Sequence, residues 1–436
     1  MTDRLPPSAP SPARPDVLQF HTLTIFPPHN VNRDEDGRPK TCLLGTAVRG
    51  RISSQAKKRA LRFAPHFPAT QRATRTREGG LLTFNRLTEA GIDRAQAAWA
   101  GLAVNMALGG GGKVPTLEDA EKLLGSGKKN KGKGKGKKAE VPAETVAEAP
   151  PSQEDIEKAL CTGQGLVVSV REFARLEEAL TTLIDAWTTA PADFATTLEE
   201  WVKRVCRDKL LTHADHDLDT ALFGRMVATD AAFNVEAACA VSHAFTTHLF
   251  KTEEDYFSAG EELNLRGGTG AAITSYAFFG GGIYYQHAVL DRAHLRLTLS
   301  QGRSADEAER LTDEAVEQFL TGLLYAQPRG KRNSHASDVA ASYVLVTRGG
   351  DPALNLGLAF LDPVGPKDGT DPMSASINRL KTFHATARSA YGLGNDVCIF
   401  NAYPPARQGN APQGDEVWTE EALRRFVLAP AVEPAA

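Results

Sequence analysis

Near the start of the chain, the pattern of apolar and polar positions changes from that of a strand to that of a helix. Val17–Phe26 is rich in β-branched and aromatic residues, which predicts a strand, and Pro27-Pro28 is expected to stop it. The polar, turn-rich stretch 29–50 predicts a loop. From Arg51 to Phe63 the pattern becomes that of a strand end running into a helix. We therefore expect a strand, a loop and a helix to open the ordered part of the chain.

The middle of the chain has a helical pattern. Between Leu87 and Leu222, apolar residues recur at three- and four-residue spacing, most clearly over Glu172–Ala190 and Phe194–Leu211. Gly125–Pro151 interrupts this pattern with seven lysines interleaved with glycine, followed by an acidic, Pro/Ala-rich half. Such a segment buries too little apolar surface to offset its ordering entropy. We expect a disordered insertion over 125–151, and a disordered tail over the Pro/Ser-rich residues 1–15.

Strand patterns return after Gly267 and mix with helices to the end of the chain. The predicted strands are Ser275–Phe279, Ile283–Leu290, His294–Leu299, Ala341–Thr347 and Gly357–Leu361. Ser304 and Glu307 have the spacing of a capping box, which predicts a helix that ends before Pro328, and a last short helix is expected from Thr419. Because strands and helices do not alternate strictly, the pattern favours an α+β sheet domain with a large helical insertion.

Composition narrows the classes of function. The 436 residues carry a formal net charge of −3, so any nucleic-acid binding has to come from local basic patches. The five cysteines are scattered and never spaced as CxxC, which argues against a disulfide framework or a zinc finger and fits a reducing, cytoplasmic location. No apolar run is long enough to span a membrane.

One segment departs from this balance. Asn32–Arg62 contains nine basic and three acidic residues, a net charge of +6. The basic residues are Arg33, Arg38, Lys40, Arg49, Arg51, Lys57, Lys58, Arg59 and Arg62.

The predicted helix in this segment has two faces. Gln55, Lys58, Arg59 and Arg62 fall at i, i+3, i+4 and i+7 and share one face, whereas Ala56, Ala60 and Phe63 can turn inward. Ser53 or Ser54 is the expected N-cap. Amides at the helix start, hydroxyls and a basic stripe together suit a phosphate backbone, although a solvated basic face would show the same pattern.

The motifs of this segment resemble the signature of the CasC family, the backbone subunit of the type I-E CRISPR Cascade complex. The resemblance rests on Asn32-Arg33-Asp34, Gly37-Arg38-Pro39-Lys40, Arg51-Ile52-Ser53-Ser54-Gln55 and Lys58-Arg59-Ala60, and in the same order on His21-Thr22-Leu23, 221–226 and 241–248. It runs from about Leu18 to Leu428 without the insertion. Two features depart from the family pattern: Lys57 stands where an apolar residue is common, and the Lys/Gly insertion is not usual.

The resemblance implies a right-hand architecture. A modified RNA-recognition-motif (ferredoxin-like) sheet over 16–62 and 218–428 would be the palm. A helical insertion over 63–217 would be the fingers, and a β-hairpin within about 245–277 would be the thumb. Copies would stack head to tail along a guide crRNA beside other Cascade subunits, kink it at regular intervals and present bases to a target DNA strand, in antiviral defence or RNA-guided targeting. The family implies no enzyme activity, no cofactor and no metal.

The resemblance also assigns RNA contacts residue by residue. The expected contacts are Asn32, Arg38, Lys40, Arg51, Ser53, Ser54, Gln55, Lys58, Arg59, Arg62, Gly224, Arg225 and Met226, with Lys331 and Arg332 in a second basic loop. Met226 would be an apolar wedge beside the displaced base, although a methionine is more often simply part of a core.

Catalytic alternatives rest on weaker patterns. His213, His216 and Asp217 lack a third ligand placed by sequence, and Asp34–Gly37 starts like a calcium loop without its closing Glu. Glu254 or Asp255 could serve a metal-dependent ribonuclease like the backbone subunits of type III complexes. Metal-dependent cleavage of complementary RNA would favour that alternative. A free-standing RNA-binding protein is the third possibility, and stable filaments on RNA would count against it.

Overall fold

The computed structural model describes residues 16–109, 113–125, 151–263, 271–366, 371–409 and 411–429. The expected tail, nearly all of the expected insertion and residues 264–270 of the expected thumb lie outside these residues. The chain divides into two compact units. The sheet unit comprises Met1–Ala69, Ala221–Phe223 and Ala237–Ala436, and the helical unit comprises Thr70–Thr220 and Gly224–Glu236, each as far as it is described.

A ten-stranded sheet organises the sheet unit, in the order β12-β11-β10-β1-β9-β7-β3-β2, with β6 and β8 also paired to β9. Its strands are β1 (Val17–His29), β2 (Thr41–Leu44), β3 (Ala47–Ile52), β6 (Cys239–Val241), β7 (Ala244–Thr246), β8 (Glu253–Gly260), β9 (Ala271–Asp291), β10 (Ala341–Gly349), β11 (Asp396–Asn401) and β12 (Glu416–Val417). Most pairs are antiparallel, and β11–β12 is parallel. The fold is therefore a mixed α+β arrangement around one large sheet, as predicted.

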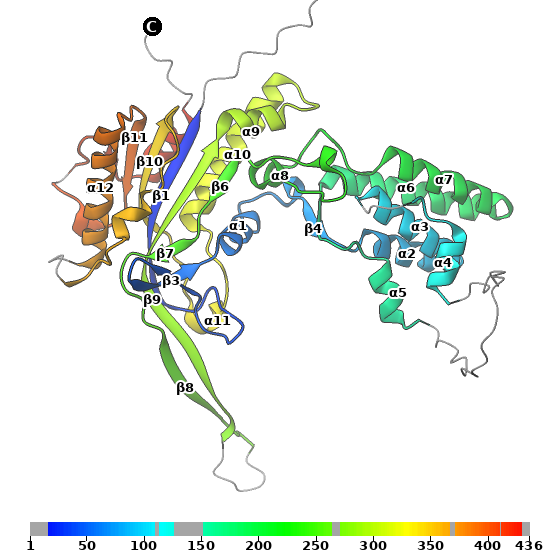
Figure 1. Cartoon of the computed structure of the whole chain (residues 1–436), viewed down its shortest axis with the longest axis horizontal. Coiled ribbons are helices and arrows are strands. Elements are labelled where there is room, and N and C mark those ends of the chain that lie inside the picture. The colour runs from blue at the N-terminus through cyan, green and yellow to red at the C-terminus, as the bar shows by residue number, and fades with distance from the viewer. Residues whose placement is uncertain are drawn as a thin grey trace, which may run out of the picture. The chain divides into compact units, whose positions relative to one another are not determined.

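Helices cover both faces of this sheet (Figure 1). They are α1 (Ser54–Arg62), α9 (Arg292–Leu299), α10 (Ala305–Tyr325), α11 (Arg332–His335), α12 (Pro372–Tyr391) and α13 (Glu420–Leu428). Phe20 of β1 packs edge-on against Phe319 of α10, with ring centroids 5.9 Å apart, whereas Leu23 belongs to a cluster with Ile377 and Leu380 of α12. Both faces of β1 are therefore buried, and its buried residues include the polar Gln19, His21 and Thr22.

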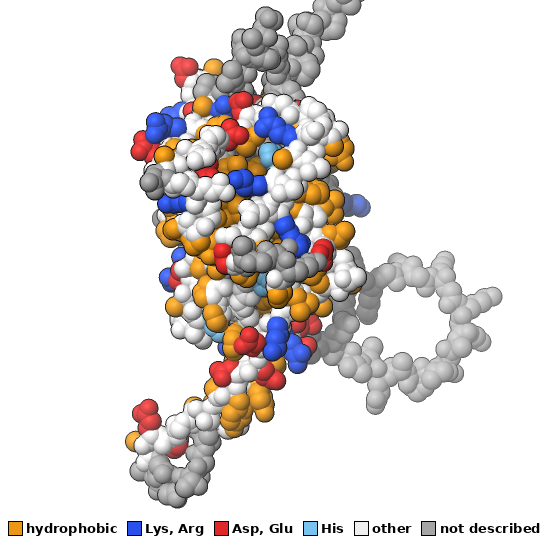
Figure 2. All heavy atoms as spheres, turned by 90° about the vertical axis from the view of Figure 1, so that its left-hand side faces the viewer, with side chains coloured by type: hydrophobic (Ala, Val, Ile, Leu, Met, Phe, Trp, Pro, Cys, Tyr) orange, Lys and Arg blue, Asp and Glu red, His pale blue; other side chains and the backbone are white. Residues whose placement is uncertain are grey.

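A hairpin made by β8 and the first half of β9 extends beyond the rest of the sheet (Figure 1). Its register pairs Glu253 with Phe279 and Gly260 with Ala271, and the tilted rings of Tyr256 and Tyr276 meet across the strands with centroids 5.3 Å apart. Every residue of β8 is exposed. Figure 2 shows acidic and apolar side chains along this hairpin. Since so little of it is buried, the hairpin adds little to the core.

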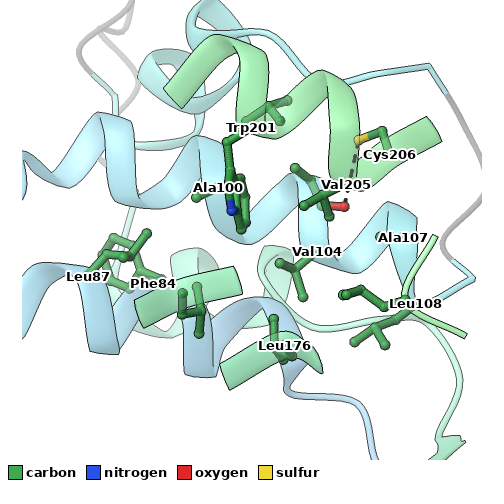
Figure 3. Close-up of a cluster of buried hydrophobic side chains, with 14 of the residues drawn as sticks. Phe84, Leu87, Ala100, Val104, Ala107, Leu108, Leu176, Trp201, Val205 and Cys206 are labelled. Atoms are coloured by element: carbon green, nitrogen blue, oxygen red, sulfur yellow. Dashed lines mark hydrogen bonds between the residues drawn. The ribbon is translucent and has the colours of Figure 1, made fainter. Parts of the chain in front are cut away.

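The helical unit packs around its own apolar core. Its helices are α2 (Gly79–Glu89), α3 (Arg94–Ala107), α4 (Leu117–Leu123), α5 (Gln153–Ala159), α6 (Val170–Thr189) and α7 (Phe194–Asp208), with a small β4 (Thr74–Thr76) and β5 (Leu166–Val168) ladder, and α8 (Leu218–Phe223) runs across the division between the units. Phe84, Val104, Leu176 and Trp201 converge from four of these helices (Figure 3). The helical period of the sequence therefore marks a real core.

Several sequence predictions need correction. His294–Leu299 is part of helix α9, because Asp291 caps the His294 amide and Leu295 and Leu299 bury one helical face. Leu297, the alternating partner, is 63% exposed. Gly357–Leu361 forms a 3-10 turn (Leu356–Phe360), and the two predicted strands around Gly280–Gly282 are the single strand β9.

The opening segment also differs in detail. β1 continues past Pro27-Pro28 to His29, and the expected loop 29–50 contains the β2–β3 hairpin. The strand–helix transition at Arg51–Phe63, helix α10 with its Ser304 cap, strand β10 and helix α13 with its Thr419 cap are confirmed. Among the described residues, no helix is both long and apolar enough to cross a membrane.

Candidate nucleic-acid interface

The N-terminus of α1 is the centre of the predicted basic surface. Ser53 is the N-cap, and its hydroxyl accepts the Ala56 amide, as predicted. The side-chain oxygen of Asn32 accepts the Ser53 amide at 2.8 Å, which fixes the preceding loop to the helix start. No acidic residue lies in the first turn of α1, so nothing offsets the positive end of the helix dipole. This end of the helix suits an anion.

Arg51 and Ser54 meet at a residue that sequence analysis did not assign to the site, His243, and Lys40 is near enough to affect its charge. The Nδ1 atom of His243 lies 3.2 Å from the Ser54 amide and 3.3 Å from the Arg51 guanidinium. Burial lowers the pKa of His243, and Arg51 and Lys40 lower it further, so its imidazole is neutral at pH 7 and accepts these hydrogen bonds. Its position directly before β7, inside the family-like segment 241–248, was the available signal.

The exposed and buried faces of α1 agree with the prediction only in part. Gln55 and Arg59 are exposed, and Lys58 and Arg62 are half-buried. Phe63 was expected to turn inward, but it is 48% exposed, and the guanidinium groups of Arg59 and Arg62 lie 4.7 and 5.7 Å from its ring centre. Leu61 and Lys57 make the buried face instead.

Two of the nine basic residues counted in the sequence are buried. The guanidinium of Arg49 donates to the carbonyls of Thr246 and Phe360 inside the sheet unit. Lys57 donates from Nζ to the side-chain oxygen of Gln327 at 2.8 Å, and burial lowers its pKa to about 7. Neither side chain is available to a phosphate. The basic surface is therefore made by the other seven residues.

The two predicted basic loops lie together. Gly330 packs so closely on the loop before Asn32 that a Cβ atom there would be 2.5 Å from the Val31 carbonyl oxygen. Lys331 and Arg332 follow it, exposed, and Arg332 pairs with Asp338 at 2.9 Å. Arg38 lies over the Phe278 ring at the root of the hairpin, 4.6 Å from its centre.

Gly224, Arg225 and Met226 lie in the helical unit, and they have different environments. The Arg225 guanidinium is buried, contacts both carboxylate oxygens of Glu172 at 2.8 and 3.0 Å, and donates to the carbonyls of Phe233 and Thr212. Its donors are occupied inside the unit, so the Arg225 guanidinium is not available to RNA, in contrast to the expectation for this residue. Met226 is 78% exposed beside it.

Some residues of the catalytic alternatives have structural roles instead. His213 stacks on Phe233 with ring centroids 4.3 Å apart, and Asp217 accepts the Val170 amide. Glu254 and Asp255 are exposed on β8. Within the described ranges, no group of three or more His, Cys, Asp or Glu residues is placed to hold a metal ion.

Comparison with known proteins adds the family. The model of the CT1975-like protein family matches residues 18–416. The chain belongs to this family. It is the CasC family that the motifs resemble, which supplies backbone subunits of CRISPR RNA-guided surveillance complexes and is generally non-catalytic. No curated protein sequence matches the chain.

Two solved structures share the fold. One is a chain described as "CRISPR RNA-guided surveillance complex, pre-nicking", with a TM-score of 0.67, 22% identity, and coverage of 94% of this chain and 99% of that chain. The other, "CRISPR RNA-guided surveillance complex", has a TM-score of 0.58, 20% identity and the same coverage of both chains. The similarity therefore extends over both units of the protein.

Proposed function

We propose that this chain is a Cascade backbone subunit that oligomerises along a guide crRNA, binds its phosphate backbone and leaves bases exposed for pairing with target DNA. The observation that carries the proposal is the convergence of Arg51 and Ser54 on His243, beside Lys40, at a helix N-terminus without acidic residues. Backbone amides, a helix dipole and cations at one point are what phosphate groups bind.

The proposal assigns a role to each part of the fold. The sheet unit acts as the palm, the helical unit as the fingers and the β8–β9 hairpin as the thumb. The described hairpin residues 253–263 and 271–279 include five acidic residues and no lysine or arginine. A hairpin of this composition does not bind phosphate. It displaces a guide base and contacts the next copy through exposed apolar groups such as Tyr256 and Tyr276.

The contact between copies is head to tail, because the hairpin of one copy meets a different surface of the next. Such heterologous contacts give open rows rather than closed dimers. RNA then sets the length of the row, and other Cascade subunits and the paired target strand complete the assembly. The chain itself catalyses no reaction in this proposal.

The test compares two Lys-Arg pairs on helices. Lys58→Ala with Arg59→Ala should weaken guide binding for every sequence and lower the slope of log affinity against log salt by about two units, because two phosphate contacts are lost. The matched control is Lys203→Ala with Arg204→Ala on α7, an exposed pair of the helical unit. It should leave the slope unchanged. An equal change in both variants, or no change in either, would contradict the proposed interface.

A further inference from the structure

A groove of about 510 Å³ lies beside the basic surface, between α1 and the residues that follow α10. Its α1 wall includes Ala56, Ala60 and Phe63, and Tyr325 and Pro328 line it from the other side. This volume lies within the range of about 300–1,000 Å³ usual for small-molecule sites, and its walls are mainly apolar, as in such sites. The groove shares Arg59 with the basic surface, and no described residue of the hairpin lines it.

The lining also holds hydrogen-bonding capacity that the protein does not use. The Nε2 atom of Gln327 is buried without a hydrogen-bond partner. Lys57 donates to the oxygen of the Gln327 amide, which leaves the NH₂ group as the unpaired donor. An unpaired buried donor is costly, so its presence in the groove wall favours a ligand with polar ring atoms over an aliphatic one.

Exposed rings and cations complete the groove. Phe63 and Tyr325 are 48% and 50% exposed, and both line this one groove. Arg59, stacked on Phe63, and Arg329 also line it, against the single acidic residue Asp338. Aromatic rings and arginine planes beside a phosphate-binding surface are the groups on which unpaired bases stack.

We propose that this groove receives one unpaired base of the bound guide RNA. The inference rests on the proposed function, since the base has to be delivered by RNA held on α1. The ring stacks on Phe63 or Tyr325 and a heteroatom of the ring accepts from the Gln327 amide. Arg59 and Arg329 meet the flanking phosphates. This site is separate from Met226, which lies in the other unit.

Crosslinking of the unaltered protein tests the proposal. The protein is assembled on guide RNA carrying 4-thiouridine at one position at a time, irradiated and digested. Peptides containing Phe63 or Tyr325 should be labelled from a subset of positions. RNA that is bound but crosslinks only elsewhere would overturn the groove assignment and leave the proposed function standing. A protein that binds no guide RNA at all would overturn both.

Filling the groove gives a second, quantitative test. Ala60→Trp should weaken guide binding about tenfold, within the range expected for loss of one base–aromatic stack, and leave the salt slope unchanged because no phosphate contact is lost. Ala385→Trp on the exposed face of α12 is the matched control and should bind normally. If Ala60→Trp does not fold, Phe63→Ala takes its place, because it removes one of the rings on which the base stacks. Equal affinity of the groove and control variants would contradict the inference.

Free nucleotide distinguishes the source of the base. Adenosine monophosphate present at millimolar concentration during irradiation should not lower the crosslink yield, because the base is held through its own RNA chain. Two results would show that the groove serves free nucleotides and that its assignment to the guide is wrong. One is binding of the mononucleotide alone at micromolar concentration. The other is a lowered crosslink yield while the RNA stays bound.

Discussion

Helix α1 and the segment Gly224–Met226 both carry arginine in family-like motifs, yet the two regions use it differently. The guanidinium of Arg59 is exposed and rests on the Phe63 ring, whereas that of Arg225 is buried between Glu172 and two carbonyls. A buried guanidinium with all its partners inside the protein holds the fold together, and an exposed one is available to a ligand. The same residue type in two similar motifs therefore predicts two different effects of mutation.

The Arg225 network also explains the shape of its segment. Arg225 and Val235 exchange backbone hydrogen bonds, and the Val227 amide donates to the side chain of Asn234. Gly224 adopts a φ of +79°, which favours glycine. Met226 is therefore held between two fixed neighbours with its side chain exposed. Arg225 positions the segment, and Met226 is the residue that a ligand can contact.

The largest expected effect comes from breaking the buried pair. Arg225→Ala leaves the Glu172 carboxylate unpaired and should lower the free energy of unfolding of the helical unit by about 3–5 kcal/mol. Tryptophan fluorescence in urea reports it, because Trp99, Trp187 and Trp201 lie in that unit. Arg59→Ala should change stability by less than about 0.5 kcal/mol. Similar losses in the two variants would remove the distinction between the two regions.

Lys57 sharpens the comparison, since it is a buried cation without a carboxylate partner. Its folded-state pKa of about 7 lies below that of the unfolded chain, so the unfolded state binds more protons above pH 7. The free energy of unfolding therefore increases as pH rises from 7 towards 10, because Lys57 loses its proton more readily in the folded protein than in the unfolded chain. Lys57→Met should raise stability by about 2 kcal/mol at pH 7 and remove that part of the pH dependence.

Denaturant titrations of the wild type and Lys57→Met at pH 6.5, 8 and 9.5 check this. The difference between the two proteins should shrink as pH rises. A difference that stays constant would show that the amine is not deprotonated in the folded protein. Lys58→Met, half-buried on the neighbouring position, is the control and should show no such trend.

The residues of α1 also show how much of the site can be predicted from the sequence. Local rules sufficed for the Ser53 cap and for the basic stripe of α1, because both depend on spacing within one helix. They failed for Lys57 and Arg49, whose burial depends on Gln327 and Thr246, far away in the chain. His243 was missed because a lone histidine has no spacing pattern of its own, and its only signal was its place in the family-like segment 241–248.

Fold errors have the same cause. Leu295, Leu297 and Leu299 fit a strand and a helix almost equally well over so short a run, and the Asp291 cap together with packing of the helix decides between them. Phe63 was assigned inward from helical spacing, but Leu61 and Lys57 occupy the face that packs. Tertiary contacts thus decided each of these positions.

The smallest expected effect concerns His243. His243→Ala removes the acceptor that fixes Arg51 and the first amide of α1, so guide affinity should fall about threefold without a change of salt slope, since the neutral ring makes no ionic contact. A filter-binding titration at several salt concentrations measures both quantities. A lowered slope would mean that His243 is charged and contacts phosphate itself.

Chemical probing of the guide in the assembled complex tests the central claim most directly. The intact protein should give reactive bases at a constant spacing along the guide, because each copy displaces one base with its hairpin. A variant with Glu253–Gly270 replaced by a short turn should fold and bind RNA through α1, and its guide should show no regular spacing. The same pattern from both proteins, or no periodic pattern from the intact one, would contradict the account.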